Sequence, residues 1–343
     1  MSENGVTSPT SLSIVVPVRN NPRDLQECLT ALVDQAPPDA EVIVVDDAST
    51  DETPAIAATF GARVLRLSIN SGPAAARNHG ARHARGNVLL FVDADVVVEH
   101  RTVDRVLKTF AEHTEVAAVF GSYDAKPRQP GVVSRYRNLL HHFVHQNGQA
   151  NASTFWAGCG AIRRDVFHEV GGFDDQRFRR PSIEDIELGQ RLRRAGHRIL
   201  LDKTIQGTHL KRWSLGSLIR TDITRRAIPW SRLILENRAI PDTLNLAWNE
   251  RVSAALVGVV GASVPLAVLR PELAALTLAA LAIFLIWNRK LYLFFFRQGG
   301  LWFTLICIPL HFLYFVYSGL GYLYAWLEHR FGAQPAARHR HGE

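Results

Sequence analysis

Val88-Leu89-Leu90-Phe91-Val92-Asp93-Ala94-Asp95 is the stretch on which the expected fold depends. An apolar run ends at two carboxylates separated by one small residue, which is typical of a buried parallel strand that ends in a polar crevice. Because alternate residues of an extended chain point the same way, Asp93 and Asp95 can present oxygens to one point. Mg²⁺ or Mn²⁺ is commonly held by one or two carboxylates together with the phosphates of a ligand. The stretch therefore predicts a divalent cation and a nucleotide diphosphate, with two solvated acids capping a strand as the alternative.

The same kind of strand end occurs earlier in the chain, where the apolar run 42–45 stops at Asp46 and Asp47. Alternation of apolar runs with amphipathic segments predicts strands at 12–18, 41–47, 63–67, 87–92 and 116–123, and helices at 24–35, 51–60, 73–85 and 99–110. Strands separated by helices of about 10 to 15 residues indicate a parallel sheet with right-handed crossovers. Ligands bind at the carboxyl ends of such strands, so the acidic strand ends are expected in one crevice.

Composition separates the chain into two parts. The 343 residues are 47% hydrophobic, but the first 210 resemble an ordinary α/β protein, whereas the last hundred or so contain long uncharged runs. Three dispersed cysteines, Cys28, Cys159 and Cys307, are too few for a disulfide framework or a zinc site. The polar start, residues 1–10, is expected to be flexible and argues against a cleaved signal peptide. The net charge of +7 lies mostly beside apolar segments, which favours a membrane surface over nucleic acid as partner.

Four motifs follow one another in a familiar order: 14–20 (IVVPVRN), 45–51 (VDDASTD), 72–80 (GPAAARNHG) and Asp93-Ala94-Asp95. Together they resemble the family 2 glycosyltransferases, which have the GT-A fold, a Rossmann-like α/β domain that binds a nucleotide sugar. The resemblance covers roughly the first two thirds of the chain. It implies that Pro17 and Arg19 line the nucleotide pocket, that Asp46 and Asp47 hold the base and ribose, that Arg77 approaches the base or diphosphate, and that Asp93 and Asp95 carry Mg²⁺ or Mn²⁺.

The segment 155–161 (FWAGCGA) combines an aromatic pair with glycines that permit close backbone approach. Such a turn can contact a sugar ring, so the predicted acceptor site includes Trp156, Gly158, Cys159 and Gly160. A tight turn packed under the sheet explains the same residues.

Glu184 and Asp185 begin a predicted helix that runs to Arg194 and stops at Gly196. The helix macrodipole alone would explain acids at this place. Their position in the family pattern implies that Asp185 is the general base that takes the proton from an acceptor hydroxyl, while Glu184 orients the site. A phosphate acceptor is already an anion and needs no base, so this acid pair favours a hydroxyl acceptor.

The segment 208–213 (THLKRW) is similar to the Gln-x-x-Arg-Trp motif of processive polysaccharide synthases, with His209 where Gln is usual. That similarity implies that Arg212 neutralises the leaving diphosphate and that Trp213 stacks on the acceptor sugar. His209 is either a third metal ligand or a strand-end histidine. Three more histidines, at 141, 142 and 145, fall on a predicted helix at 132–144, where solvated or acceptor-facing side chains are favoured over a metal site.

The second part of the chain has a basic start and an apolar remainder. Residues 211–240 contain seven Lys or Arg and two acids. Residues 211–250 are therefore predicted to form amphipathic helices in a membrane interface, with a break at Pro229-Trp230. The alternative is an ordinary helix packed on the catalytic domain. The apolar runs 252–269, 273–287 and 301–327 predict about three membrane spans within 251–328, followed by a polar tail at 329–343. Three spans would leave Arg330 outside, against the positive-inside rule, so two or four spans stay open.

The sequence thus predicts an inverting, metal-dependent family 2 glycosyltransferase, with a GT-A domain at 11–210, anchored in the cytoplasmic membrane and active on its cytoplasmic face. The expected donor is a UDP-sugar, or second a GDP-sugar, and the expected acceptor is a hydroxyl of a lipid or lipid-linked molecule in glycolipid or cell-envelope biosynthesis. The alternatives are a polyprenyl-phosphate sugar transferase, a processive polysaccharide synthase and a non-enzymatic nucleotide-sugar-binding membrane protein.

Overall fold

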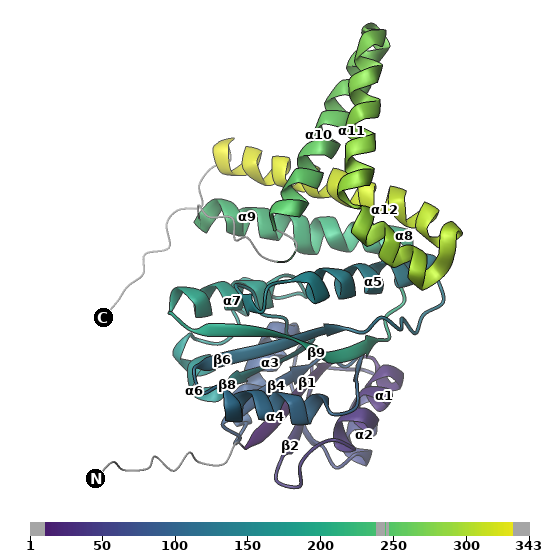
Figure 1. Ribbon diagram of the computed structural model, residues 1–343. Coiled ribbons are helices and arrows are strands. Elements are labelled where there is room, and N and C mark those ends of the chain that lie inside the picture. Colours follow the sequence, from purple (N-terminus) through teal and green to yellow (C-terminus); the bar gives the residue numbers. More distant parts are fainter. Residues whose placement is uncertain (1–10, 238–243, 245–246, 332–343) are drawn as a thin grey trace, which may run out of the picture. The chain divides into compact units, whose positions relative to one another are not determined.

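The computed structural model describes residues 11–237, 244 and 247–331. Its backbone divides into two compact units, Met1–Trp213 and Ser214–Glu343 (Figure 1). The first unit is an α/β domain built on one mixed sheet, and the second is entirely helical in its described part.

Nine strands form the sheet in the described part of the first unit, in the order β3-β2-β1-β4-β8-β6-β9-β5, with the short β7 paired to β9. The strands are β1 (Leu12–Val18), β2 (Glu41–Asp46), β3 (Arg63–Arg66), β4 (Val88–Val92), β5 (Val96–Val98), β6 (Val116–Tyr123), β7 (Asn151–Ala152), β8 (Cys159–Arg163) and β9 (Arg198–His209). β1 pairs in parallel with β2 and β4, and β2 pairs in parallel with β3. The four-stranded parallel arrangement predicted from the sequence is therefore confirmed.

The second half of the sheet is mixed and was not predicted. β8 runs antiparallel to β4 and β6, β6 is parallel to β9, and β5 is antiparallel to the end of β9. The helix predicted from residue 99 begins only at Thr102, because Val96–Val98 form β5 and Arg101 turns the chain with a φ of 66°. This short strand places the residues after Asp95 beside the end of β9.

The helices of the first unit flank the sheet. They are α1 (Pro22–Val33), α2 (Thr53–Thr59), α3 (Pro73–His83), α4 (Thr102–Glu112), α5 (Val132–Asn147), α6 (Arg164–Glu169) and α7 (Glu184–Arg194). Ile14 on β1, Val44 on β2 and Leu90 on β4 are fully buried, as are Leu25 and Leu29 of α1, which belong to the same apolar core. This core fixes the carboxyl ends of the parallel strands, where the predicted site residues lie.

The second unit begins with one continuous helical segment made of α8 (Leu215–Thr221), a π-helical stretch η1 (Asp222–Ala227) and α9 (Ile228–Asn237). The predicted break at Pro229-Trp230 is wrong, since Pro229 is the second residue of α9. Within this continuous segment Pro229 has no N–H to donate to the preceding turn, and that turn is the π-helical stretch η1.

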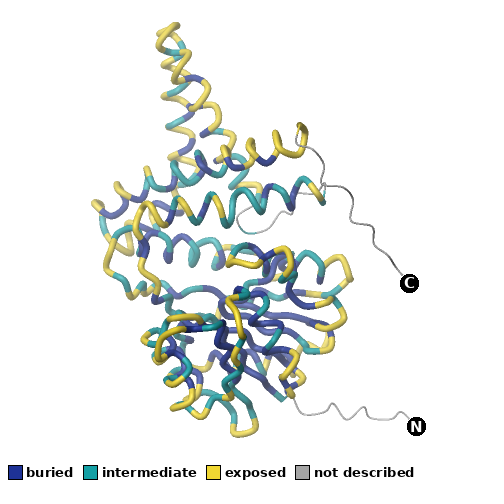
Figure 2. The backbone as a smooth tube through the Cα atoms, turned by 180° about the vertical axis from the view of Figure 1, so that it is seen from behind, coloured by how far each residue is buried: buried dark blue, intermediate teal, exposed yellow. Residues whose placement is uncertain are grey.

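Three apolar helices follow: α10 (Trp248–Leu269), α11 (Ala274–Trp287, preceded by the 3-10 turn Pro271–Leu273) and α12 (Arg289–Phe331). In the described part of the chain, α10 and α12 are long and apolar enough to cross a membrane, judged by length and composition, and α11 is shorter. α12 is interrupted at Gly300, whose φ of 74° is not helical. Many of the apolar side chains of this unit are exposed (Figure 2).

Candidate active site

The segment Asp93-Ala94-Asp95 joins β4 to β5 and is held from both sides. The backbone N–H of Asp93 donates to the carbonyl of Gly158 at 3.2 Å, and the N–H of Leu210 donates to the carbonyl of Asp95 at 2.8 Å. Register in the β5–β9 pair sets Val96 opposite His209. Backbone pairing therefore brings the two acids next to the turn at Gly158 and the end of β9.

Arg77 of α3 joins two of the predicted site acids. Its guanidinium is buried and lies 2.6 Å from Asp93 Oδ1 and 3.1 Å from Glu184 Oε1, and its Cζ is 5.4 Å from the centre of the Phe173 ring. Burial alone would lower the pKa of Arg77, but Asp93 and Glu184 outweigh it and raise the pKa above its ordinary value. The three residues form a charge network in which the buried Arg77 bridges the buried Glu184 and the partly exposed Asp93.

Asp185 follows Glu184 in the first turn of α7. Its Oδ1 accepts from the N–H of Ile186 at 2.8 Å and its Oδ2 accepts from the N–H of Ala157 at 3.2 Å. Burial, and then the neighbouring charge of Glu184, raise the pKa of Asp185 to about 7. A carboxyl group that titrates near neutrality can accept a proton and release it again at working pH.

The helix that carries these acids was predicted correctly. α7 runs from Glu184 to Arg194, and the chain turns at Gly196 with a φ of 88°. Such a left-handed conformation is available to glycine without steric cost, which explains the end of the helix.

Asp95 faces a different side chain from Asp93. Its Oδ2 lies 3.5 Å from Nε2 of His209. Burial alone would raise the pKa of Asp95, but His209, together with Lys211, outweighs it and lowers the pKa. For Asp93, burial prevails over the opposing charge of Arg77 and raises the pKa. The two acids of the triplet are thus electrostatically distinct.

The three predicted metal ligands do not form a ready metal centre. Among the residues that the structure describes, no three His, Cys, Asp or Glu side chains are arranged to hold a metal ion. Asp93 is turned toward Arg77, whereas Asp95 and His209 face each other. Carboxylate and imidazole are nevertheless donors that suit Mn²⁺, and a cation bound with a diphosphate needs only one or two protein ligands. In donor type, these residues fit a divalent cation.

Asp46 and Asp47, at the end of β2, are engaged by backbone groups. Asp46 Oδ1 accepts from the N–H of Ser49 at 3.0 Å, and the two oxygens of Asp47 accept from the N–H groups of Ser71 at 2.7 Å and Gly72 at 2.9 Å. Both side chains are buried. Their predicted contacts with base and ribose stay a prediction, and in this conformation they shape the loops around the crevice.

The other predicted donor residues differ in exposure. Pro17 is buried within β1, opposite Val45 of β2, and Arg19 is exposed just beyond the strand. Arg212 is also exposed.

The predicted acceptor residues of the segment 155–161 are packed closely. A Cβ on Gly158 would lie 2.5 Å from the ring of Trp156, and a Cβ on Gly160 would lie 2.3 Å from the Trp156 carbonyl oxygen. Cys159 is fully buried in β8. The glycines therefore let the Trp156 turn fold onto the strand, and the Cys159 side chain points away from solvent.

Trp213 is buried as well. The N–H of Trp213 donates to Ser134 Oγ of α5 at 2.8 Å, and Lys211 Nζ lies 4.5 Å from the centre of its ring. The indole is 6% exposed, so stacking on a sugar would require Lys211 to move.

A stack of rings that the sequence did not reveal supports His209. The His209 ring lies 4.4 Å from the Tyr123 ring, with an angle of 10° between their planes, and Tyr123 in turn lies 4.3 Å from His141. His141 stacks on His145 at 3.9 Å. The only sequence signal for Tyr123 was its place as the last residue of a predicted strand.

The α5 histidines are not uniformly solvated, which corrects the prediction for His145. This side chain is buried, and its Nδ1 lies 2.9 Å from the carbonyl oxygen of Gly121. Burial lowers the pKa of His145 to about 4, so its ring is neutral at physiological pH. His142 Nδ1 lies 2.8 Å from the Tyr123 carbonyl oxygen. These histidines hold α5 to the end of β6.

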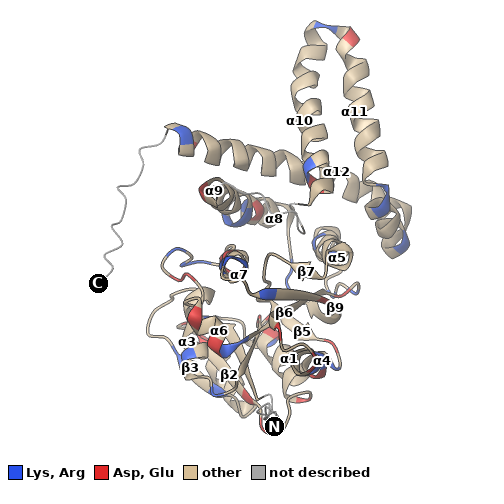
Figure 3. Cartoon of the chain, turned by 60° about the vertical axis from the view of Figure 1, so that its left-hand side comes forward, with Lys and Arg blue, Asp and Glu red and all other residues tan. Residues whose placement is uncertain are grey.

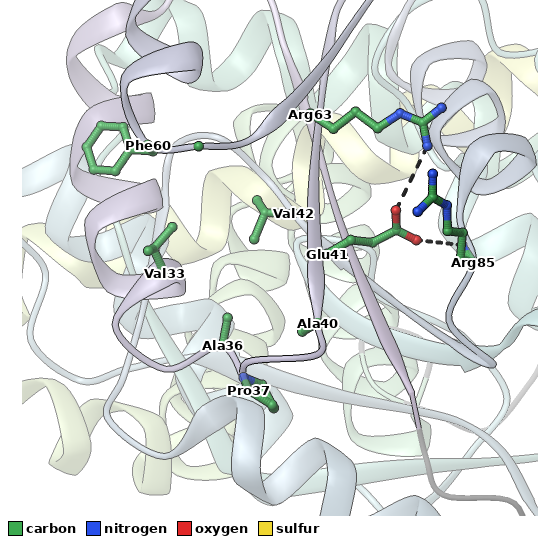
Figure 4. Close-up of a pocket in the computed structure, with 10 residues that line it drawn as sticks. Val33, Ala36, Pro37, Ala40, Glu41, Val42, Phe60, Arg63 and Arg85 are labelled. Atoms are coloured by element: carbon green, nitrogen blue, oxygen red, sulfur yellow. Dashed lines mark hydrogen bonds and ion pairs between the residues drawn. The ribbon is translucent and has the colours of Figure 1, made fainter.

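A pocket at the opposite ends of the strands is separate from this site (Figure 4). It lies beside the first residues of β2 and β3, where Glu41 Oε1 accepts from Ser13 Oγ at 2.6 Å and from the N–H of Arg85 at 2.5 Å. Glu41 is also 3.9 Å from Arg63. The charged groups of this pocket therefore tie strands together at the edge away from the acidic strand ends.

Comparison with known proteins identifies the type of domain. Residues 13–171 match the family model described as Glycosyl transferase family 2. The chain is 27% identical over 221 residues to glycosyltransferase AglE of Haloferax volcanii, covering 61% of this chain and 69% of AglE. It is 27% identical over 243 residues to glycosyltransferase GlyG of Streptococcus pneumoniae, covering 66% of this chain and 77% of GlyG. Two other curated relatives are matched over 21% and 55% of their length.

A solved structure shares the fold. It is the mannosyltransferase PcManGT from Pyrobaculum calidifontis in complex with GDP-Man and Mn²⁺, with a TM-score of 0.56 and 18% identity. The match covers 93% of this chain and 88% of PcManGT. The mixed α/β sheet is therefore that of the GT-A glycosyltransferases.

Proposed function

We propose, from the premise that the chain is a glycosyltransferase with a family 2 domain over residues 13–171, that it is an inverting, metal-dependent enzyme that uses a hydroxyl acceptor. The donor is a nucleotide diphosphate sugar, and the acceptor is a lipid or a lipid-linked molecule at the cytoplasmic membrane face. The observation that carries the proposal is the half-buried Asp185 carboxyl group, which lies beside the Arg77 network with a pKa of about 7.

The donor is expected at the carboxyl ends of β1, β2 and β4. Arg19 and Arg212 are exposed cations that can meet phosphate oxygens, and Arg77 offers a buried positive charge beside Asp93. Asp46 and Asp47 hold the loops that would contact the base and ribose. UDP-sugars and GDP-sugars are the donors to compare, and the GDP-Man bound to PcManGT makes GDP-mannose a useful member of the panel.

Asp95 and His209, with Asp93 beside them, are the residues that would hold Mg²⁺ or Mn²⁺. Such a cation would neutralise charge on the departing diphosphate. The stacking of His209 on Tyr123 keeps its imidazole next to Asp95.

Asp185 performs the proton transfer in this proposal. Its carboxylate takes the proton from the acceptor hydroxyl while that oxygen attacks the anomeric carbon and the bond to the diphosphate breaks. A single displacement of this kind inverts the anomeric configuration. Glu184 raises the pKa of Asp185, and the N–H groups of Ile186 and Ala157 fix the direction of its oxygens.

The lipid character of the acceptor rests on the helical unit. Two of its helices, α10 and α12, are apolar and long enough to cross a bilayer. In their most apolar 18-residue segments, only 22% and 28% of the residues are buried. Association with a membrane would present lipid head groups to an enzyme carried on the same chain.

Replacing Asp185 with Asn tests the function. Purified protein is incubated with Mg²⁺ or Mn²⁺, a panel of nucleotide sugars and a native lipid extract, and nucleoside diphosphate release and lipid mass are measured. General base catalysis contributes about 10² to 10⁴ in rate, so transfer should fall by this factor while donor affinity is kept. The exposed Asp104→Asn in α4 is the matched control and should transfer normally.

Other outcomes separate the alternatives. Unchanged transfer in Asp185→Asn would reject the base and indicate an acceptor that is already an anion, as in a polyprenyl-phosphate sugar transferase. A similar loss of donor binding and transfer would also count against the base assignment. Products of many sugar units would indicate a processive synthase, and no diphosphate release with any lipid would contradict an enzyme of this kind.

A further inference from the structure

The second half of α12 is fastened to the charged helical segment that opens the second unit. Tyr317 Oη donates to Asp222 Oδ2 at 2.6 Å, and Arg232 makes two bonds to the Glu328 carboxylate, at 2.7 and 2.9 Å. Between them, Gly321 packs so closely that an added Cβ would lie 2.9 Å from Cβ of Ala227. These contacts hold α12 alongside η1 and α9 over the range 317–328, as Figure 1 also shows.

Away from these contacts, this part of α12 exposes large apolar side chains around much of its circumference. They are Leu320, Tyr322, Leu323, Tyr324, Trp326, Leu327 and Phe331, with exposed fractions between 41% and 74%. The helical segment on the fastened side carries Asp222, bonded to Arg226, and the exposed Arg220. Ionised side chains are costly in the hydrocarbon core, whereas a pair of helices with one charged and one apolar side suits the interface of a bilayer.

α12 is itself uncharged over residues 298–327, but it packs against the charged segment η1–α9, whereas α10 and α11 pack against each other. They form an antiparallel hairpin, and residues 252–269 and 274–287 contain no charged side chain. Figure 3 shows charges at the tip of the hairpin and at its base, and none along its length. The tip holds Arg270 and Glu272, which lie 3.6 Å apart and are both exposed.

The hairpin also satisfies its own polar groups. Thr277 Oγ1 donates to Ser263 Oγ at 2.8 Å between the two helices, and the Asn288 amide donates to Ser253 Oγ at 3.0 Å near the base. At about 1.5 Å per residue, 18 uncharged residues of α10 reach about 27 Å, close to the thickness of the hydrocarbon core.

We infer that the α10–α11 hairpin crosses the bilayer twice, and that all of α12 stays in the interface on the side from which the hairpin enters. The inference rests on the membrane association in the proposed function and replaces the three predicted spans with two. It puts Arg289, Lys290, Arg297 and Arg330 on the same side as Arg220, and leaves only the Arg270–Glu272 pair on the other. This arrangement removes the conflict with the positive-inside rule.

Single cysteines and a membrane-impermeant maleimide test the arrangement in the full chain. The native cysteines at 28, 159 and 307 are all buried, and the parent protein measures their background. Glu272→Cys reports the hairpin tip, Arg330→Cys reports the end of α12, and Asp39→Cys reports the exposed surface of the first unit. Each is labelled in sealed right-side-out and inside-out vesicles.

The maleimide should label Arg330→Cys and Asp39→Cys in vesicles of the same orientation. It should label Glu272→Cys only in vesicles of the other orientation. If the maleimide labels Arg330→Cys in the same vesicles as Glu272→Cys, α12 crosses the bilayer and the inference is overturned. If it labels Glu272→Cys in the same vesicles as Asp39→Cys, the hairpin does not cross. Recovery of the parent chain as a water-soluble oligomer would assign the apolar surfaces to a second copy and would also overturn it.

Labelling does not depend on catalysis, so nucleoside diphosphate release from the same variants separates the two proposals. Normal release with the wrong labelling pattern rejects the topology alone, and the expected pattern without release rejects the proposed enzyme function alone.

Discussion

Two strand ends of the same sheet carry nearly the same sequence pattern and use it differently. At the end of β2, an apolar run stops at Asp46 and Asp47, and their carboxylates accept hydrogen bonds from backbone N–H groups. Asp46 also lies 3.3 Å from the exposed Arg66 of β3. At the end of β4, an apolar run stops at Asp93 and Asp95, and their carboxylates face the side chains of Arg77 and His209. The first pair is held mainly by backbone groups of nearby loops, and the second pair is held by side chains from distant elements, which a ligand can displace or share.

The difference comes from where the partners originate. Ser49 is three residues from Asp46, and Ser71 and Gly72 belong to the turn before α3. The partners at β4 come from α3 and from the end of β9, elements that only the folded sheet brings together. Acids at the end of an apolar run therefore predict where the residues lie in the fold. Their hydrogen-bond and ion-pair partners determine whether the acids hold loops or take part in the chemistry of the site.

The largest expected effect comes from removing the cation at the β4 end. Arg77→Met leaves the buried Glu184 and the partly exposed Asp93 without their shared countercharge, and breaking the buried Arg77–Glu184 pair costs about 3 to 5 kcal/mol. The free energy of unfolding, measured by denaturant titration in detergent, should fall by this amount, and transfer should be lost.

Arg82→Met is the matched control, because Arg82 lies on the same helix and is exposed. Its free energy of unfolding should change little. Equal effects of the two variants would mean that the Arg77 network contributes no more than an exposed arginine, which would contradict the comparison.

A smaller effect is expected at the β2 end. Asp47→Ala removes the acceptor of two N–H groups, those of Ser71 and Gly72, and leaving a buried donor unsatisfied costs about 1 to 3 kcal/mol. Asp47→Asn keeps one oxygen and should lose less stability. The control is Asp39→Ala, at an exposed loop position.

Donor affinity, measured by calorimetry on the Asp47 variants, sharpens the comparison. If Asp47 acts on the loop alone, affinity should follow stability across the variants. A loss of affinity in Asp47→Asn without a loss of stability would assign its carboxylate to the ligand, as the family resemblance implies, and would contradict the purely structural role.

The parallel half of the fold could be predicted because each of its strands has a local signal. The runs at β1, β2 and β4 are apolar and end at acids or turns, and helices with clear spacing separate them. α7 was equally local, since the acids at its start and Gly196 after its end define it.

The mixed half could not be predicted because its pairing is set by tertiary contact. The three valines Val96–Val98 suit a strand, but so short a run does not reveal its partner, and β9 pairs with it only in the folded sheet. The contacts within the candidate site could not be predicted for the same reason. The acids Asp93 and Asp185 were found from motifs, but the Arg77–Glu184 bridge joins residues 107 positions apart, and the stack of Tyr123 on His209 depends on β6 and β9 lying side by side.

The smallest expected effect is a change of rate with pH. Asp185 accepts a proton only when it is ionised, and burial together with Glu184 raises its pKa to about 7. The turnover rate at saturating donor should therefore be constant above this pH and fall about tenfold for each unit below it. Diphosphate release between about pH 5 and 8 gives the profile.

Two variants decide which group the inflection belongs to. Because the Glu184 charge raises the pKa of Asp185, Glu184→Gln should move the inflection to lower pH, whereas Asp104→Asn, an exposed control, should leave it in place. The residual activity of Asp185→Asn should lose the inflection, since its only titrating base is gone. An inflection near pH 7 that survives in Asp185→Asn would belong to another group. Asp185 would then not be the general base that acts beside the acids at the end of β4.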